Sequence, residues 1–269
     1  MGETVAVLGA GKMGEALLSG LLRSGRPAAE LLFTERHEDR AKALTAQYGI
    51  EAVTATDAAK RADTLLVAVK PQEIGVLLDE LAGVVTPDSL VISIAAGIPT
   101  ATFEQRLAEG TPVVRVMSNT PALVDEAMSA ISPGAHATGD HLARTEALLS
   151  PVGKVIRVPE NQLDAVTALS GSGPAYFFYL VEAMIEAGIL LGLPRAVAAD
   201  LIIQTAIGSA VMLRDSGEHP VQLREAVTSP GGTTIAAIRT LEDHGVRAAL
   251  LAALEAARDR SRELAAGNS

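Results

Sequence analysis

The chain has 269 residues, of which 48% are hydrophobic and only 3% aromatic, with no cysteine and no tryptophan. This length allows one large domain or two medium ones with a sizeable buried core. The formal net charge of −10 argues against a nucleic-acid partner, because phosphate contacts need a basic surface. The lack of cysteine excludes disulfides, thiolate metal sites and cysteine nucleophiles, and we expect no metal site.

The first residues show no basic segment followed by an apolar one, so we expect no signal peptide. Uninterrupted apolar stretches, such as residues 65–69, are far shorter than the roughly 20 residues that cross a bilayer. The absence of cysteine also fits a reducing compartment. These features predict a cytoplasmic protein that does not bind a membrane.

The first half of the chain alternates short apolar runs with helical patterns, which predicts βαβ units and a parallel sheet. The runs are continuous rather than alternating, as expected for strands with helices on both faces. The expected strands are Thr4–Leu8, Leu31–Thr34, Thr64–Val69, Leu90–Ala95 and Val113–Met117, completed by the pair Ala127–Ser132 and Lys154–Val158. The expected helices between them are Lys12–Arg23, Arg36–Tyr48, Gln72–Leu81 and Thr100–Leu107.

Beyond residue 160 the strand patterns end and helical patterns follow. We expect helices over Leu163–Leu191, interrupted at Gly171–Pro174, and over Arg195–Asp215 and Val246–Leu264. The Arg195–Asp215 segment is apolar on most faces, and such a helix needs more cover than one neighbouring sheet supplies. We therefore expect this half to pack against a second copy of the chain. A monomer in which the helical layer folds onto the sheet is the alternative.

The predicted fold class is therefore α/β. Residues 1–160 are expected to form a dinucleotide-binding Rossmann domain with a doubly wound parallel sheet. Residues 161–269 are expected to form an all-helical substrate and dimerisation domain.

The run VAVLGAGKMG at residues 5–14 contains G-x-G-x-x-G after an expected strand and at the start of an expected helix. Gly9 permits the tight turn, Gly11 lets the backbone approach a pyrophosphate, and Gly14 allows close packing of helix and strand. Free N–H groups at the helix start then attract phosphate charge. The pattern predicts that NADPH or NADH binds through Leu8, Gly9, Ala10, Gly11, Lys12, Met13 and Gly14.

Charged residues at the end of the second expected strand leave the choice of dinucleotide open. Glu35 lies at the position where an acidic residue usually binds the ribose hydroxyls of NAD. Arg36, with Arg40 close behind, can instead hold the 2′-phosphate of NADP, and a solvated charge cluster is a third interpretation. Because ligands bind outside the carboxyl ends of parallel strands, two further strand ends should border the cofactor with Ala68, Val69, Lys70, Pro71, Ala95 and Ala96. Pro71 also suits the first turn of a helix.

Three segments have a composition that is unusual for connecting loops: residues 115–122 (RVMSNTPA), 169–176 (LSGSGPAY) and 228–234 (TSPGGTT). In the third, Pro-Gly-Gly precedes two threonines and an apolar helical run, so several backbone N–H groups are free at a helix start. Such a cradle suits a carboxylate. A loop with an ordinary threonine N-cap is the alternative interpretation.

With these motifs the chain resembles the pyrroline-5-carboxylate reductase family over essentially its whole length. The resemblance implies a Rossmann domain and a helical domain that interlocks two subunits, hence a homodimer at least, and in many members a decamer. The segments that carry it are GAGKMG (9–14), VKPQ (69–72), SIAAG (93–97), NTPA (119–122), DAVTALSGSGPAY (164–176) and LREAVTSPGGTT (223–234), the last two nearly diagnostic. The chain departs from the pattern at Ser118, where proline is usual, at Asp125 and Ala127, where glycines are common, and at Ala226, which is polar in many relatives.

The resemblance implies NAD(P)H-dependent reduction of a small molecule, 1-pyrroline-5-carboxylate, to L-proline in the last step of proline biosynthesis. It implies that Gly231, Gly232 and Thr233 hold the substrate carboxylate and that Thr234 places its hydroxyl near the ring nitrogen. Glu160 matches a family position near the substrate amine, although a lone glutamate before a helix is more often a cap-region charge. No histidine lies in these motifs, so we expect catalysis by positioning and electrostatics, with Thr234 as hydrogen-bond partner and candidate proton source.

Two other functions fit part of the pattern. A β-hydroxyacid dehydrogenase shares the glycine fingerprint but needs a lysine acid/base in the helical half, and every lysine of this chain precedes residue 160. A dinucleotide sensor would bind the cofactor without turnover. A sensor has no need of the carboxylate cradle at residues 228–234, so the sequence favours the reductase.

Overall fold

The computed structural model describes residues 2–266, which form two compact units. Unit 1 contains the described residues up to Ser172 and those from Ala257 onward, and unit 2 is Gly173–Ala256. The sequence places its boundary between residues 160 and 161, whereas the compact units divide after residue 172.

Unit 1 is built on an eight-stranded sheet with the order β3-β2-β1-β4-β5-β6-β7-β8. The order runs outward in both directions from β1, which is the doubly wound arrangement, and the predicted fold class is confirmed. The strands are β1 (Val5–Leu8), β2 (Leu31–Thr34), β3 (Glu51–Ala52), β4 (Thr64–Val67), β5 (Leu90–Ser93), β6 (Val113–Met117), β7 (Ala127–Pro133) and β8 (Gly153–Arg157).

One end of the sheet departs from the expected parallel arrangement. The strands from β3 to β6 are parallel, but β7 is antiparallel to β6, and β8 is parallel to β7. The connection from Met117 to Ala127 is too short for the crossover that a parallel pair requires. The sheet is therefore mixed, with β7 and β8 reversed at one edge.

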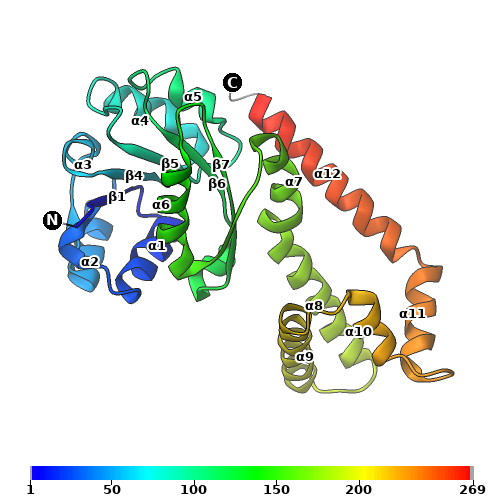
Figure 1. Ribbon diagram of the computed structural model, residues 1–269. Coiled ribbons are helices and arrows are strands. Elements are labelled where there is room, and N and C mark those ends of the chain that lie inside the picture. Colours follow the sequence, from blue (N-terminus) through cyan, green and yellow to red (C-terminus); the bar gives the residue numbers. More distant parts are fainter. Residues whose placement is uncertain (1, 267–269) are drawn as a thin grey trace. The chain divides into compact units, whose positions relative to one another are not determined.

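Helices cover both faces of this sheet (Figure 1), which explains why its strands are apolar on both sides. The helices of the two layers are α1 (Lys12–Arg23), α2 (Glu38–Tyr48), α3 (Ala55–Arg61), α4 (Ile74–Leu81), α5 (Thr100–Glu104) and α6 (Gly139–Leu149). Val5 and Val7 of β1 belong to a cluster with residues of α1, α2 and α6, whereas Ala6 and Leu8 belong to a cluster with residues of α3, α4 and α5. Short 3-10 turns connect the helices and strands at Ala28–Glu30, Pro71–Glu73, Thr120–Val124, Ser150–Val152 and Glu160–Gln162.

The chain leaves the sheet through α7 (Leu163–Val166) and a π-helical turn, Thr167–Gly171. The Ser172 N–H donates to the Thr167 carbonyl at 2.8 Å, the five-residue spacing of a π turn. A side chain at Gly171 would collide with Met117. The helix is therefore interrupted earlier than the predicted Gly171–Pro174: the break is a widened turn at Thr167–Gly171 against the end of β6, and the next helix already begins at Gly173.

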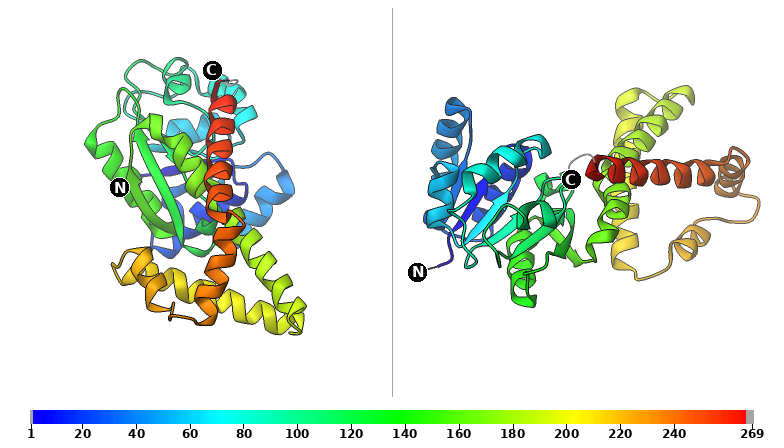
Figure 2. Two further views of the ribbon diagram at one scale, coloured as in Figure 1. Left: turned by 90° about the vertical axis from the view of Figure 1, so that its right-hand side faces the viewer. Right: turned by 90° about the horizontal axis from the view of Figure 1, so that it is seen from above.

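The last helix, α12 (Val246–Ala266), is uninterrupted (Figure 2). Within unit 1 its end contacts α7, where the Ser261 hydroxyl donates to Asp164 Oδ1 at 2.7 Å. Arg262 adds a longer ion pair to the same carboxylate. These contacts assign the C-terminal turns of α12 to the first unit.

Unit 2 consists of α8 (Gly173–Leu190), α9 (Arg195–Asp215), α10 (Pro220–Ala226), α11 (Thr233–Asp243) and the first part of α12. Among residues 173–256, all of which the structure describes, only Gly173 and Ala198 are buried. The large apolar side chains that are more than 60% exposed are Phe177, Phe178, Tyr179, Leu190, Leu191, Val227 and Leu251. A single chain therefore provides no hydrophobic core for this unit.

Two helical segments, residues 160–190 and 195–215, are long and apolar enough to cross a bilayer by length and composition alone. Their apolar windows have mean hydropathies of 1.2 and 1.8, and only 6% of each window is buried in the chain. The sequence prediction considered uninterrupted apolar runs and missed these segments, because isolated polar residues interrupt them. Apolar helices that pack in a dimer have the same length and composition, so these two properties fit a subunit interface as well as a membrane span.

Candidate functional site

The glycine fingerprint forms the turn between β1 and α1. Gly9 has φ of +100°, in the left-handed region, and Gly11 is the N-cap residue of α1 with no side-chain cap. A Cβ at Gly11 would meet no atom within 4 Å, whereas one at Gly14 would collide with the Gly9 carbonyl oxygen. Thr34 secures the turn, because its hydroxyl accepts the Gly9 N–H and its carbonyl accepts the Ala10 N–H, both at 2.9 Å.

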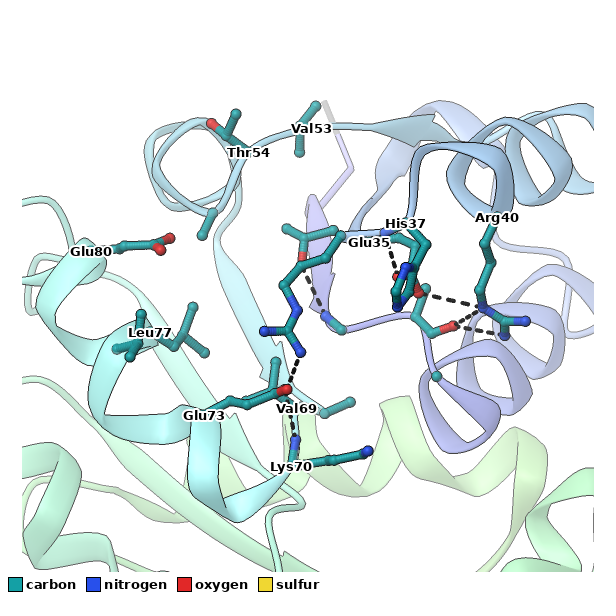
Figure 3. Close-up of a pocket in the computed structure, with 18 of the residues that line it drawn as sticks. Glu35, His37, Arg40, Val53, Thr54, Val69, Lys70, Glu73, Leu77 and Glu80 are labelled. Carbon is teal, nitrogen blue, oxygen red and sulfur yellow. Dashed lines mark hydrogen bonds and ion pairs between the residues drawn. The ribbon is translucent and has the colours of Figure 1, made fainter.

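A cavity of about 780 Å³ opens beside this turn, at the carboxyl ends of β1, β2 and β4 (Figure 3). It brings together eight of the residues expected to bind the cofactor: Gly9, Ala10, Gly11, Glu35, Arg36, Ala68, Val69 and Lys70. Its volume lies in the range of small-molecule sites. The sequence therefore identified the glycine turn itself and the strand ends on both sides of it, those of β2 and β4.

A second cavity of about 220 Å³ shares Ala68 and Val69 with the first and extends toward β5 and β6. Four further predicted residues line it: Met13, Pro71, Ala95 and Ala96. Three predicted residues lie outside both cavities, because Leu8 is buried in β1, Gly14 is packed against the turn, and Lys12 is exposed on α1.

The end of β2 carries a network that ties its charges to the glycine turn. Glu35 is only 10% exposed and accepts the His37 N–H at 3.0 Å. Arg40 lies 3.4 Å from Glu35, donates twice to the Ala10 carbonyl at 2.9 and 3.1 Å, and pairs with Glu15 at 2.8 Å. Arg40 is thus held by two carboxylates and a carbonyl.

Arg36 behaves differently from Arg40. Its side chain is 77% exposed and pairs with Glu73, which also lines the cavity. The other Glu73 oxygen accepts the Lys70 N–H at 3.4 Å. The exposed arginine at the end of β2 is therefore engaged by a carboxylate from the segment after β4.

Sequence reasoning missed several residues of this cavity: Val53, Thr54, Ala55, Gln72, Glu73, Val76, Leu77 and Glu80. Thr54 accepts the Asp57 N–H at 3.1 Å as N-cap of α3, and a threonine three residues before an aspartate was an available helix-start signal. The two-residue strand β3 gave no comparable signal.

The residues fit the phosphates of a dinucleotide. The Gly11 position is open, and the first turn of α1 has no side-chain cap, so its N–H groups remain available to an anion. Tyr48 supports this helix, because its hydroxyl donates to Glu15 at 3.0 Å. Burial, followed by that hydrogen bond, raises the pKa of the Tyr48 hydroxyl above its usual value.

In unit 2, the loop before α11 leaves the start of that helix without a side-chain cap. Gly231 is left-handed with φ of +69°, and Gly232 is the N-cap of α11 with no side-chain cap. A side chain at Gly232 would lie 2.5 Å from the Ser229 hydroxyl. No threonine caps this helix, so the alternative of an ordinary threonine N-cap is wrong.

Glu160 lies in unit 1, where three donors bind its carboxylate. The Thr100 N–H and hydroxyl each donate at 2.9 Å, and Arg115 Nη1 donates at 3.1 Å. Arg115 is largely buried in β6. The Glu160 carboxylate thus links the start of α5 and β6 to the 3-10 turn that precedes α7.

Asn119 joins two of the unusual segments. Its Nδ2 donates to the carbonyl and hydroxyl oxygens of Ser170 at 3.2 and 3.3 Å, and its Oδ1 accepts the Met128 N–H at 3.0 Å. The NTPA segment therefore holds the π turn against the end of β6, next to the second cavity, which Ser118 lines.

Comparisons with known proteins agree with both parts of the chain. Residues 160–264 match the family described as "Pyrroline-5-carboxylate reductase dimerisation", and residues 4–97 match "NADP oxidoreductase coenzyme F420-dependent". A pyrroline-5-carboxylate reductase of Corynebacterium melassecola is 45% identical over 265 residues, covering 97% of this chain and 98% of its own length. One from Mycobacterium tuberculosis is 45% identical over 283 residues, covering 97% and 96%.

Solved structures give the same result. The pyrroline-5-carboxylate reductase of Coxiella burnetii is similar with a TM-score of 0.93 at 35% identity, covering 97% of this chain and 98% of the other. The Plasmodium falciparum pyrroline carboxylate reductase with NADP bound is similar with a TM-score of 0.87 at 26% identity, covering 98% of each chain. With such identity over nearly the full length of its relatives, the chain belongs to the pyrroline-5-carboxylate reductase family.

Proposed function

We propose that the protein reduces 1-pyrroline-5-carboxylate to L-proline with NAD(P)H, the last step of proline biosynthesis. The observation that carries the proposal is the 45% identity to named pyrroline-5-carboxylate reductases over 97% of the chain. The open glycine turn of unit 1 and the uncapped Pro-Gly-Gly loop of unit 2 support it, because uncapped N–H groups at two helix starts would suit the phosphates of the cofactor and the carboxylate of the substrate.

We propose that the cofactor binds to the residues that line the two adjoining cavities and to the glycine fingerprint itself. The turn from Gly9 to Gly14 would bind the phosphates through backbone N–H groups. The residues around Ala68 and Ala95 would leave room for the nucleotide, because they are small. When bound, the reduced nicotinamide supplies the hydride that adds to the C5 imine carbon, while the ring nitrogen takes up a proton.

For the substrate, we propose that the loop from Gly231 to Thr234 binds the carboxylate. The left-handed Gly231 turns the chain so that the first N–H groups of α11 have no side-chain competitor. Thr234 would donate a hydrogen bond to the ring nitrogen, which makes the imine carbon more electrophilic. The chain then accelerates the reaction by position and pocket electrostatics.

The contacts of Glu160 favour a structural role, as a charge that caps the segment before α7, over a contact with the substrate amine. Three donors already bind its carboxylate, so a substrate amine would have to compete with Arg115 and Thr100. We propose that Glu160 mainly fixes the chain before α7, as a cap-region charge.

We further propose a homodimer formed by unit 2. The unit buries only Gly173 and Ala198 by itself, and its residues belong to the segment that matches the dimerisation family. A second copy would cover its apolar helices and account for the two segments that resemble membrane spans by composition. A cytoplasmic location and assembly of dimers into a decamer are extensions of this proposal.

Steady-state oxidation of NADH and of NADPH with 1-pyrroline-5-carboxylate, followed by absorbance of the reduced nicotinamide, tests the reaction. We expect turnover with at least one cofactor and L-proline as product. Binding of cofactor without turnover would instead support the sensor. Oxidation of a 3-hydroxy acid with NAD or NADP would support the β-hydroxyacid dehydrogenase, which we do not expect because no lysine follows residue 160.

A further inference from the structure

The two arginines at the end of β2 are not equally available to a ligand. Arg40 donates twice to the Ala10 carbonyl and faces both Glu15 and Glu35. Its charge is matched by these carboxylates, and moving it would release the glycine turn. Arg40 therefore serves the turn rather than an incoming anion.

Arg36 is the arginine that can exchange partners. Its side chain is 77% exposed, and within the described chain its ion pair is to Glu73. Both residues line the 780 Å³ cavity. An exposed ion pair is weak and readily exchanged, so a dianionic phosphate placed in the cavity can replace the single carboxylate.

NADPH and NADH differ only by the 2′-phosphate, and an arginine after the second strand is the usual group that accommodates it. Glu73 opposes this contact in two ways, because it occupies Arg36 and because its own negative charge repels a phosphate. NADH has no 2′-phosphate and therefore does not need a hydrogen bond or ion pair from Arg36. Glu73 therefore affects the two cofactors unequally.

We propose that Glu73 is a specificity-determining residue, which restrains Arg36 by an ion pair across the cavity and thereby lowers the preference of the enzyme for NADPH over NADH. This inference rests on the proposed function, because it takes the cavity as the cofactor site. The sequence alone did not suggest it, since Glu73 lies 37 residues from Arg36 and belongs to the segment after a different strand.

The dissociation constants of NADPH and NADH, measured by nicotinamide fluorescence on the whole protein, test the proposal without turnover. Glu73→Gln keeps the side-chain shape and an oxygen that can accept the Lys70 N–H. We expect NADPH to bind about three- to tenfold more tightly to this variant and NADH to change by less than about twofold. Glu38→Gln is the matched control, because it removes an exposed carboxylate that lies close to Arg36 in sequence, pairs with Lys42 and does not line the cavity.

A double-mutant cycle identifies Arg36 as the intermediary. Arg36→Gln should weaken NADPH binding, and Glu73→Gln added to it should produce much less gain than in the wild-type background. An unchanged NADPH-to-NADH ratio in Glu73→Gln, or an equal gain without Arg36, would overturn the inference while leaving the reductase intact. Failure of the wild-type protein to bind either cofactor would instead contradict the proposed function, and this inference with it.

Discussion

Gly14 of α1 lies directly against the carbonyl oxygen of Gly9, so that a side chain at position 14 would collide with the backbone of the turn. Gly11, between them, meets no such obstacle. Gly14 is therefore required for packing of α1 against the turn, whereas Gly11 leaves space for a ligand. Alanine at these two positions should cause different defects.

Gly14→Ala should lower the free energy of unfolding by about 1–3 kcal/mol, because the added methyl group forces α1 away from β1. Gly11→Ala should fold with a stability within about 1 kcal/mol of wild type, since its φ of −66° suits alanine, yet bind NADPH at least about tenfold more weakly. Thermal unfolding and cofactor titration check both. Equal cofactor affinity in Gly11→Ala and wild type would contradict close approach of a phosphate at this position.

Thr234→Ala should lower kcat/KM for 1-pyrroline-5-carboxylate by about tenfold, the effect of one lost hydrogen bond to the transition state. Thr234→Ser should restore most of it, because the hydroxyl returns. Thr240→Ala on the same helix is the control, since the Thr240 hydroxyl donates to the Ala236 carbonyl. Unchanged kinetics in Thr234→Ala would remove this threonine from the mechanism.

The exposed aromatic side chains of α8 predict a subunit interface. Light scattering at micromolar concentration should give a mass at least twice the 27.7 kDa of the chain. Phe178→Glu should shift the mass toward the monomer, because it places a charge on an apolar surface that is 69% exposed in the single chain. Leu123→Glu, at a site in unit 1 that is 57% exposed, should leave the assembly unchanged. A stable wild-type monomer would support the alternative in which the helical layer covers its own sheet.

Asn119→Asp should destabilise unit 1 by about 1–3 kcal/mol, because a carboxylate oxygen then faces the Ser170 carbonyl without a donor. The acceptor for the Met128 N–H remains in this variant. Ser170→Ala removes only the hydroxyl contact of 3.3 Å and should have the smaller effect. Chemical denaturation of the three proteins compares them, and equal stabilities would contradict a structural role for the Asn119 hydrogen bonds.

Tyr48 should ionise at higher pH than an ordinary tyrosine, because burial and the hydrogen bond to Glu15 raise the pKa of its hydroxyl. A raised pKa in the folded chain means that the protonated hydroxyl stabilises the protein below about pH 10 and that this contribution is lost as pH rises through the folded value. Absorbance titration of the phenolates, compared with Tyr48→Phe, should show that the last ionising tyrosine disappears in the variant. If the last step persists, Tyr48 is not the perturbed group.

Much of the fold follows from short-range patterns. The strands Leu31–Thr34 and Val113–Met117 and the helices Lys12–Arg23 and Arg195–Asp215 have the expected bounds, because continuous apolar runs and helical periodicity are local properties. The sequence analysis missed β3, α3 and α10, which are short, and α6, whose leucines are separated by charged and polar residues. Their place depends on neighbours that a local pattern does not contain.

Asp125, a departure from the family pattern, shows the same difference between what the sequence and what the structure can explain. The family resemblance implies a glycine at this position, and the structure gives Asp125 a left-handed φ of +62° and an ion pair with Arg23 at 2.5 Å. Aspartate tolerates this conformation better than most residues do. The sequence showed that a substitution had occurred, and the structure showed why it is accommodated.

The sequence by itself determined the glycine turn, the alternation of strands and helices, the excess of apolar helical surface and the family resemblance, because each depends on residue type and spacing along the chain. Only the tertiary structure decided that β7 and β8 reverse the sheet edge, that Arg40 turns inward to the Ala10 carbonyl, and that Glu73 engages Arg36. These relationships join residues far apart in sequence, and their charges act over distances that only the folded chain defines.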